Sequence, residues 1–296
     1  MSSATRYMVV GMPRSGTTAV HNTLRGHPSV SALHKEVAVD PFLTQGVAIF
    51  TRKHPKTRPS ISSLFDLMTS TQSVAEPEAQ GMKLTTGSNE RARAFAEGVR
   101  THLPDVRIIL LVRRDLVAQF GSLVKSQETG VWGRHVGESK VRSAPTLELN
   151  RYEFAEYAIE AYQIRRILRS MQDSHQILEI GYEEVLLSGN LPTHDSLFNF
   201  VGVEPRRANW LTDRKLSPPP ESYIENYQQL LSLHNRIKRS LENGVAPETL
   251  RSAYARPLLE TIWQKARFWG QRPGYAAYRL EEALRDWMSE DRRTDS

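Results

Sequence analysis

Residues Arg6–Thr18 read RYMVVGMPRSGTT, and they are the most informative segment of the chain about its fold. Its first half is a short apolar run that ends in glycine, which is typical of a buried β-strand. A helix is expected over about Ser15–Arg25. Gly11 and Gly16 lie five residues apart and allow a tight turn between the two elements. The stretch predicts a strand–loop–helix unit whose helix N-terminus points unpaired backbone N–H groups at an anion.

The loop from Gly11 onward has the outline of a phosphate-binding P-loop, GxxxxGK[ST], with one substitution. Thr17 stands where nucleotide-hydrolysing enzymes place a lysine, so the main positive charge for β- and γ-phosphates is missing. A cation is present earlier in the loop, as Arg14. The alternative is a plain strand–turn–helix junction in which Ser15 caps the helix. The coincidence of strand, glycines, hydroxyls and cation favours a phosphate cradle.

Strand and helix patterns alternate further along the chain. Residues Val106–Val112 (VRIILLV) give the strongest strand pattern, and Gln176–Tyr182 predicts a third strand. Asn89–Leu103 and Tyr152–Met171 read as helices. This alternation predicts an α/β fold in which helices flank a central parallel sheet, with extra helices towards the C-terminus. Ligands of such sheets bind where the strands end and the helices begin.

Composition limits the classes of protein that the chain can represent. Its 296 residues are 39% hydrophobic and 24% charged, which excludes a disordered or collagen-like chain. We expect a single domain over residues 1–296, with a core over about 6–235 and a C-terminal helical extension over about 236–290. The absence of cysteine excludes disulfides, thiolate nucleophiles and Cys-based metal sites.

Charge and the terminal segment indicate the setting and the ligand. The formal net charge of +6 suits an anionic ligand. The sequence has no apolar run of the ~20 residues that a membrane-spanning helix needs. Its N-terminus lacks the pattern of a signal peptide. From these features we expect a cytoplasmic protein without a transmembrane segment.

The first loop is similar to that of the sulfotransferases that use 3′-phosphoadenosine 5′-phosphosulfate (PAPS). Pro13–Thr18 matches without a gap the family pattern P-[KR]-S-G-T-[ST]. The resemblance implies the P-loop-like α/β fold of that family, with PAPS as sulfuryl donor. It also implies that Arg14 stabilises the bridging oxygen as the sulfuryl group leaves. The residues that it implies for the 5′-phosphosulfate are Arg14, Ser15, Gly16, Thr17 and Thr18.

A second family pattern follows the Val106–Val112 strand. The family has R-[DN]-P at this place and a serine eight residues after the arginine, and Arg114 and Ser122 fit that spacing. Leu116 replaces the proline. The resemblance implies that Arg114 and Ser122 bind the 3′-phosphate of PAPS, which suits the fork of a guanidinium. Arg113 competes for this role but has Gly121 at the matching offset. The alternative is an exposed basic pair and a serine on a solvated helix face.

Transfer of a sulfuryl group to a hydroxyl needs a base near the sulfur atom. Glu36, in HKEV after HPSV, lies where bacterial and heparan-type sulfotransferases carry their catalytic glutamate, so the chain resembles that branch. His102, in THLP, resembles the histidine base of cytosolic hormone sulfotransferases. However, His102 directly precedes a strand and is expected at the opposite end of the sheet. His34 is a weaker alternative on the loop that we expect to carry Glu36.

Lys83 completes the expected catalytic set of Glu36, Arg14 and Lys83. It lies 31 residues before Arg114, about where related enzymes have a lysine that contacts the transferred group or the acceptor. A solvated surface lysine is the alternative. The resemblance implies no metal and a hydroxyl acceptor on a small molecule, a glycan or a lipid. We also expect the Gln127–Pro145 segment to act as a lid, and the C-terminal helices to be the candidate surface for a homo-oligomer.

Two other classes of function compete with sulfuryl transfer. A kinase or NTPase with a degenerate P-loop would need a lysine in the loop and a magnesium-binding acid after another strand. The second junction instead offers Arg113, Arg114 and Asp115, of which two suit a phosphate. A basic nucleic-acid-binding protein would gather its positive charge in a recognised motif, whereas lysine and arginine are spread along this chain. We therefore expect no nucleic-acid partner.

Overall fold

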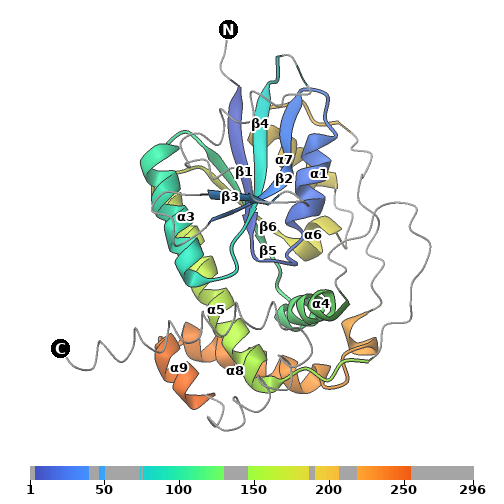
Figure 1. Ribbon diagram of the computed structural model, residues 1–296, viewed down its shortest axis with the longest axis vertical. Coiled ribbons are helices and arrows are strands. Elements are labelled where there is room, and N and C mark those ends of the chain that lie inside the picture. The colour runs from blue at the N-terminus through green and yellow to red at the C-terminus, as the bar shows by residue number, and fades with distance from the viewer. Residues whose placement is uncertain are drawn as a thin grey trace, which may run out of the picture. The chain divides into compact units, whose positions relative to one another are not determined.

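The structure is a computed structural model (Figure 1), and it describes residues 4–39, 47–50, 74, 76–129, 146–186, 191–206 and 219–254. Its sheet contains β1 (Thr5–Gly11), β2 (Val30–Val39), β3 (Val47–Phe50), β4 (Ala79–Thr85), β5 (Arg107–Val112) and β6 (Ile177–Gly181). The α-helices described up to residue 242 are α1 (Thr17–Arg25), α3 (Asn89–His102), α4 (Leu116–Thr129), α5 (Arg151–Arg169), α6 (Tyr182–Leu186), α7 (Leu191–Val201) and α8 (Tyr227–Glu242).

The sheet has six strands in the order β3-β2-β4-β1-β5-β6. The edge strand β3 runs antiparallel to β2, and the remaining neighbours are all parallel. The predicted α/β class with a central parallel sheet is therefore confirmed. The chain passes from β1 to one side of the sheet and later returns to the other, so β1 lies at the topological switch point. Ligands of open α/β sheets bind in the crevice beyond the carboxyl end at this point.

Alternating side chains of the central strand pack against helices on both faces of the sheet. Tyr7 and Val9 of β1 belong to a cluster with Val20 and Leu24 of α1 and with residues of α7. Met8 and Val10 point to the other face and are fully buried. In Figure 1, α3 and α5 lie on one side of the sheet and α1 and α7 on the other. This covering explains why β1 and β5 read as almost continuous apolar runs.

Three strands were not predicted from the sequence, and two of them carry expected site residues. Glu36 and His34 were expected on a loop, but both lie within β2. Lys83 lies within β4, which occupies the middle of the sheet between β2 and β1. The third strand without a prediction, β3, has four residues, and the segments on either side of it, 40–46 and 51–73, lie outside the described residues.

The chain divides into two compact units, Met1–Leu250 and Arg251–Ser296. The first unit holds the sheet, the helices that cover it and α8, which contacts α4 and α5. Of the second unit the structure describes residues 251–254, which end the short helix α9 (Pro247–Ala253) and follow it. The expected domain boundaries and the oligomer surface remain predictions.

Candidate active site

The first loop leaves β1 at Gly11 and enters α1 through two left-handed residues. A Cβ on Gly11 would lie 2.5 Å from the Oγ of Ser15 and 2.9 Å from the carbonyl oxygen of Leu111, so the loop closes only over a glycine. Arg14 has φ 66 and Gly16 has φ 93. The N-cap residue of α1 is Gly16, which has no side chain that could cap the helix. The alternative in which Ser15 caps the helix is therefore wrong, and the first-turn amides of α1 point outward for an anion.

Arg14 joins the first loop to α4, the helix that follows the second loop. Its Nε donates a hydrogen bond to the Oγ of Ser122 on α4 over 2.9 Å. Burial, followed by the charge of Arg113, lowers the pKa of Arg14 below its ordinary value. Two residues predicted for different phosphates of one nucleotide are thus in direct contact across the switch point.

The second loop leaves β5 and enters α4 through Asp115. The Oδ1 of Asp115 accepts the backbone N–H of Ala118 over 2.8 Å and so caps the helix. Glu183 accepts the backbone N–H groups of Arg114 (3.1 Å) and Asp115 (3.2 Å). The Arg114 side chain is 69% exposed and forms an ion pair with Glu184. The structure therefore places Arg114 at the expected edge of the sheet, with a carboxylate on its guanidinium.

Lys83 is a buried part of the site. The residue is 9% exposed, and its Nζ donates to the Oγ1 of Thr18 in the first turn of α1 over 2.9 Å. The alternative of a solvated surface lysine is therefore wrong. In the parallel pairing of β2 with β4, Glu36 lies opposite Lys83. The backbone of Glu36 is thus next to Lys83, while its side chain and that of His34 lie outside what the structure describes.

His102 lies away from these residues, as the sequence predicts. It is the last residue of α3, and the chain then enters β5 at Arg107. Because β5 runs parallel to β1, this entry lies at the amino end of the sheet, whereas Gly11 lies at the carboxyl end. His102 is therefore excluded as a base for chemistry at the first loop.

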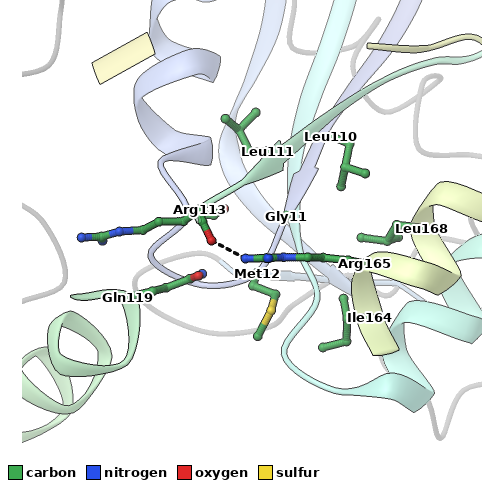
Figure 2. A pocket seen from close by; sticks show the side chains of 10 residues that line it. Gly11, Met12, Leu110, Leu111, Arg113, Gln119, Ile164, Arg165 and Leu168 are labelled. Carbon is green, nitrogen blue, oxygen red and sulfur yellow. Dashed lines mark hydrogen bonds between the residues drawn. The ribbon is translucent and has the colours of Figure 1, made fainter. Parts of the chain in front are cut away.

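A small pocket lies directly behind the first loop, between it and α5 (Figure 2). Three buried polar atoms of its lining have no hydrogen-bond partner among the described residues, namely the Oγ of Ser15, the Oε1 of Gln119 and the Nε of Arg113. Buried polar atoms normally have partners, so such a cluster marks a place where a water molecule or a ligand atom fits.

Three polar residues of this pocket were not assigned a role from the sequence. Gln119 donates from its Nε2 to the carbonyl oxygen of Pro13 over 2.9 Å, and the Nη1 of Arg113 donates to that of Arg14 over 3.3 Å. Arg165 reaches across from α5 to the carbonyl oxygen of Arg113 (Figure 2). A polar residue within the apolar run LVAQFGSLV was the one available signal for Gln119.

Some expectations fall on residues that the structure does not describe, and two searches cover only the described part. The expected lid lies outside it from residue 130 to 145. Within the described ranges, no group of three or more potential metal-ligating side chains comes together. Among the same residues, no helix has both the length and the apolarity needed to cross a bilayer.

Solved structures similar to this chain include several bacterial sulfotransferases. The sulfotransferase from Alicyclobacillus acidocaldarius has a TM-score of 0.52 at 16% sequence identity, over 86% of this chain and 100% of that one. The sulfotransferase domain from the curacin biosynthetic pathway gives 0.49 at 13% identity, over 82% and 99%. The domain from the Synechococcus PCC 7002 olefin synthase gives 0.46 at 14% identity, over 87% and 97%. The first likeness supports the fold, and the other two scores are too low to add to it.

Sequence comparison gives the family directly. No curated protein matches the chain. The model of the sulfotransferase family matches residues 7–207, which include most of β1, the two loops of the site and α7. This match covers more than half of the chain and agrees with the resemblance of Pro13–Thr18 to the family's first loop. The protein belongs to the sulfotransferase family.

Proposed function

We propose that this sulfotransferase takes its sulfuryl group from PAPS and transfers it to a hydroxyl of a small molecule, a glycan or a lipid. The observation that carries the proposal is the 2.9 Å hydrogen bond between Arg14 and Ser122. A nucleotide with phosphates at both its 5′ and 3′ positions needs cations and donors on both sides of the switch point. Arg14 of the first loop and Ser122 of α4 offer such groups from the two sides and are directly hydrogen-bonded to each other.

The first loop is proposed to hold the 5′-phosphosulfate. Its donors are the guanidinium of Arg14 and the amides and hydroxyls of residues 15–18 at the start of α1. The left-handed backbone at Arg14 and Gly16 fits a loop shaped around an anion. So does the buried Oγ of Ser15, which has no hydrogen-bond partner among the residues that the structure describes. Arg114 and Ser122 are proposed to hold the 3′-phosphate, which requires Arg114 to leave Glu184.

The proposed chemistry uses three side chains near the carboxyl ends of β2, β4 and β1. When bound, PAPS supplies an activated sulfuryl group on a phosphate leaving group. Glu36 takes the proton of the attacking hydroxyl, and Arg14 balances the negative charge that grows on the leaving oxygen. Lys83, which already bonds to Thr18 in the first turn of α1, adds a second positive charge beside Glu36.

The competing assignment is a kinase-like phosphoryl transferase. Asp115 is the acid that follows β5, where such an enzyme needs a ligand for magnesium. Its Oδ1 caps α4 and its Oδ2 accepts the hydroxyl of Tyr227 over 3.0 Å. Both carboxylate oxygens of Asp115 are thus engaged in hydrogen bonds within the protein. Together with threonine in place of the P-loop lysine, this favours sulfuryl over phosphoryl transfer.

The proposal is tested by incubating the protein with PAPS carrying ³⁵S and a panel of alcohol, phenol and sugar acceptors, in parallel with γ-labelled ATP and magnesium. We expect acceptor-dependent transfer of ³⁵S and no transfer from ATP. Transfer of the γ-phosphoryl group without transfer of ³⁵S would overturn the proposal and favour the kinase-like alternative.

A further inference from the structure

The backbone of Arg14 is unusual for its residue type. Among the described residues, it is the one non-glycine position with positive φ. A left-handed conformation costs an L-residue with a Cβ about 1–2 kcal/mol relative to glycine. Such a conformation persists where the surrounding structure fixes it, and it is often part of a binding or catalytic site. The residues that fix it are therefore candidates for a functional role of their own.

The carbonyl groups on both sides of Arg14 are held by side chains of the second loop and helix. Gln119 donates to the carbonyl of Pro13 over 2.9 Å, and Arg113 donates to the carbonyl of Arg14 itself over 3.3 Å. The first carbonyl belongs to the peptide plane before the Cα of Arg14 and the second to the plane after it. Holding both planes fixes φ and ψ of Arg14, and with them the direction in which its side chain leaves the loop.

Arg113 is itself held in one place. The residue is 6% exposed, its guanidinium lies over the ring of Tyr182 at 4.3 Å from the ring centroid, and its own carbonyl accepts a hydrogen bond from Arg165. No salt bridge to Arg113 is found in the described part of the chain. A buried guanidinium that packs on an aromatic ring and donates to a backbone carbonyl fixes the position of that carbonyl.

We infer that Arg113 and Gln119 are positioning residues: they hold the left-handed Arg14 so that its guanidinium meets the 5′-phosphate end of the nucleotide. This rests on the proposed function and adds residues that act through Arg14. Arg113 thereby differs in role from its neighbour Arg114, which is proposed to act on the 3′-phosphate.

The test measures dissociation constants by calorimetry for adenosine 3′,5′-bisphosphate, adenosine 5′-monophosphate and adenosine 3′-monophosphate. Arg113→Met should lower the affinity for the two nucleotides with a 5′-phosphate about tenfold, because loss of a charged hydrogen bond has roughly this effect. The affinity for the 3′-monophosphate should stay within about twofold of the wild-type value. Arg114→Met is the matched control and should lower the affinity for the two nucleotides with a 3′-phosphate. Equal losses for all three ligands in Arg113→Met would overturn the inference.

Gln119→Met provides a second test, because it changes no charge. It should likewise lower the affinity for the nucleotides with a 5′-phosphate more than the affinity for the 3′-monophosphate. This variant remains informative if Arg113→Met does not fold. An unchanged affinity for all three nucleotides in Gln119→Met would contradict the positioning role of Gln119.

A double-mutant cycle separates positioning from direct contact with the nucleotide. In an Arg14→Gly background there is no side chain left to position, so adding Arg113→Met should change the affinity for the bisphosphate by less than about twofold. A full tenfold loss in that background would mean that Arg113 acts on the nucleotide directly. If the wild-type protein does not bind the bisphosphate, the proposed function fails rather than this inference alone.

Discussion

The position of Arg14 within the first loop changes what the loop can reach. A P-loop lysine follows the second glycine and extends along the β- and γ-phosphates. Arg14 instead precedes that glycine, and its guanidinium points to Ser122 on the helix that follows the neighbouring strand. A cation at this place suits an anion that lies between the two loops. It does not suit a chain of phosphates that leads away from the first loop.

Arg114 is bonded to two acidic residues, of which one pairs with the guanidinium that is proposed to bind the 3′-phosphate. Glu184 pairs with the guanidinium, and Glu183 accepts the N–H groups of Arg114 and Asp115. The pair of Arg114 with Glu184 is exposed, so breaking it costs at most about 1 kcal/mol. Glu184→Gln should therefore strengthen binding of adenosine 3′,5′-bisphosphate by about two- to fivefold in calorimetry. Binding of adenosine 5′-phosphosulfate should not change.

A weaker affinity for the bisphosphate in Glu184→Gln would show that Glu184 supports Arg114 rather than competing with the phosphate. An equal gain for both nucleotides would show a general effect of charge, because only one of them carries a 3′-phosphate.

Glu36→Gln tests the proposed base. Glutamine keeps the size of the side chain but cannot take the acceptor's proton, so kcat should fall by about 10² or more. Affinity for adenosine 3′,5′-bisphosphate should stay near the wild-type value, because Glu36 is assigned to the acceptor side. His102→Asn and His34→Asn should each retain most of the activity. Loss of turnover in His102→Asn with a mild effect of Glu36→Gln would refute this base.

At the scale of elements, β1 and β4 pair closely because Gly81 leaves room for an aromatic ring. A Cβ at Gly81 would lie 1.9 Å from the Cζ of Tyr7. Gly81→Ala should thus lower the free energy of unfolding by about 3 kcal/mol, measured by urea titration. Gly87→Ala is the control, since its Cβ would lie 3.9 Å from the nearest atom, the Cγ of Pro13. Equal stabilities of the two variants would contradict this packing.

The contact of α8 with α5 should make stability depend on pH. Burial, and then the charge of Arg165, lowers the pKa of His234 to about 4, and its Nε2 lies 2.9 Å from the hydroxyl of Tyr162. The folded protein therefore resists protonation below the ordinary pKa of 6.5, where the unfolded chain takes up a proton. Stability should fall from about pH 6.5 towards pH 4, by up to about 1.4 kcal/mol per pH unit.

His234→Gln keeps a hydrogen-bonding group but does not titrate in this range. Urea unfolding at pH 7 and pH 5 should show a smaller loss of stability for this variant than for the wild type. Identical losses would mean that His234 does not carry the pH dependence.

The elements that could be predicted from the sequence are those with a strong local pattern. β1 and β5 are buried on both faces and read as apolar runs, and the first loop carries its glycines and cation in one short segment. β2 and β4 were missed because polar and charged residues interrupt their apolar pattern, as Lys35 and Glu36 do in β2 and Gln80 and Lys83 do in β4. Contacts such as that of Gln119 with Pro13 join residues 106 positions apart, and no local pattern reveals them.

At the scale of the whole molecule, the sheet order brings segments distant in sequence to one edge. The loop after β1, the loop after β5 and the strand β4 with Lys83 meet at the switch point. The formal net charge of +6 favours the approach of an anionic nucleotide to the chain. The site proposed at this edge takes a nucleotide with separate 3′- and 5′-phosphates, rather than a linear triphosphate.

The most direct test of that claim is calorimetric titration of the wild-type protein with adenosine 3′,5′-bisphosphate in EDTA, and with ATP in the presence of magnesium. We expect the bisphosphate to bind without added metal and at least about tenfold more tightly than adenosine 5′-monophosphate, because Arg114 and Ser122 add contacts to its 3′-phosphate. Magnesium–ATP should not displace it. Tighter binding of magnesium–ATP, or equal affinities for the bisphosphate and the 5′-monophosphate, would contradict the account.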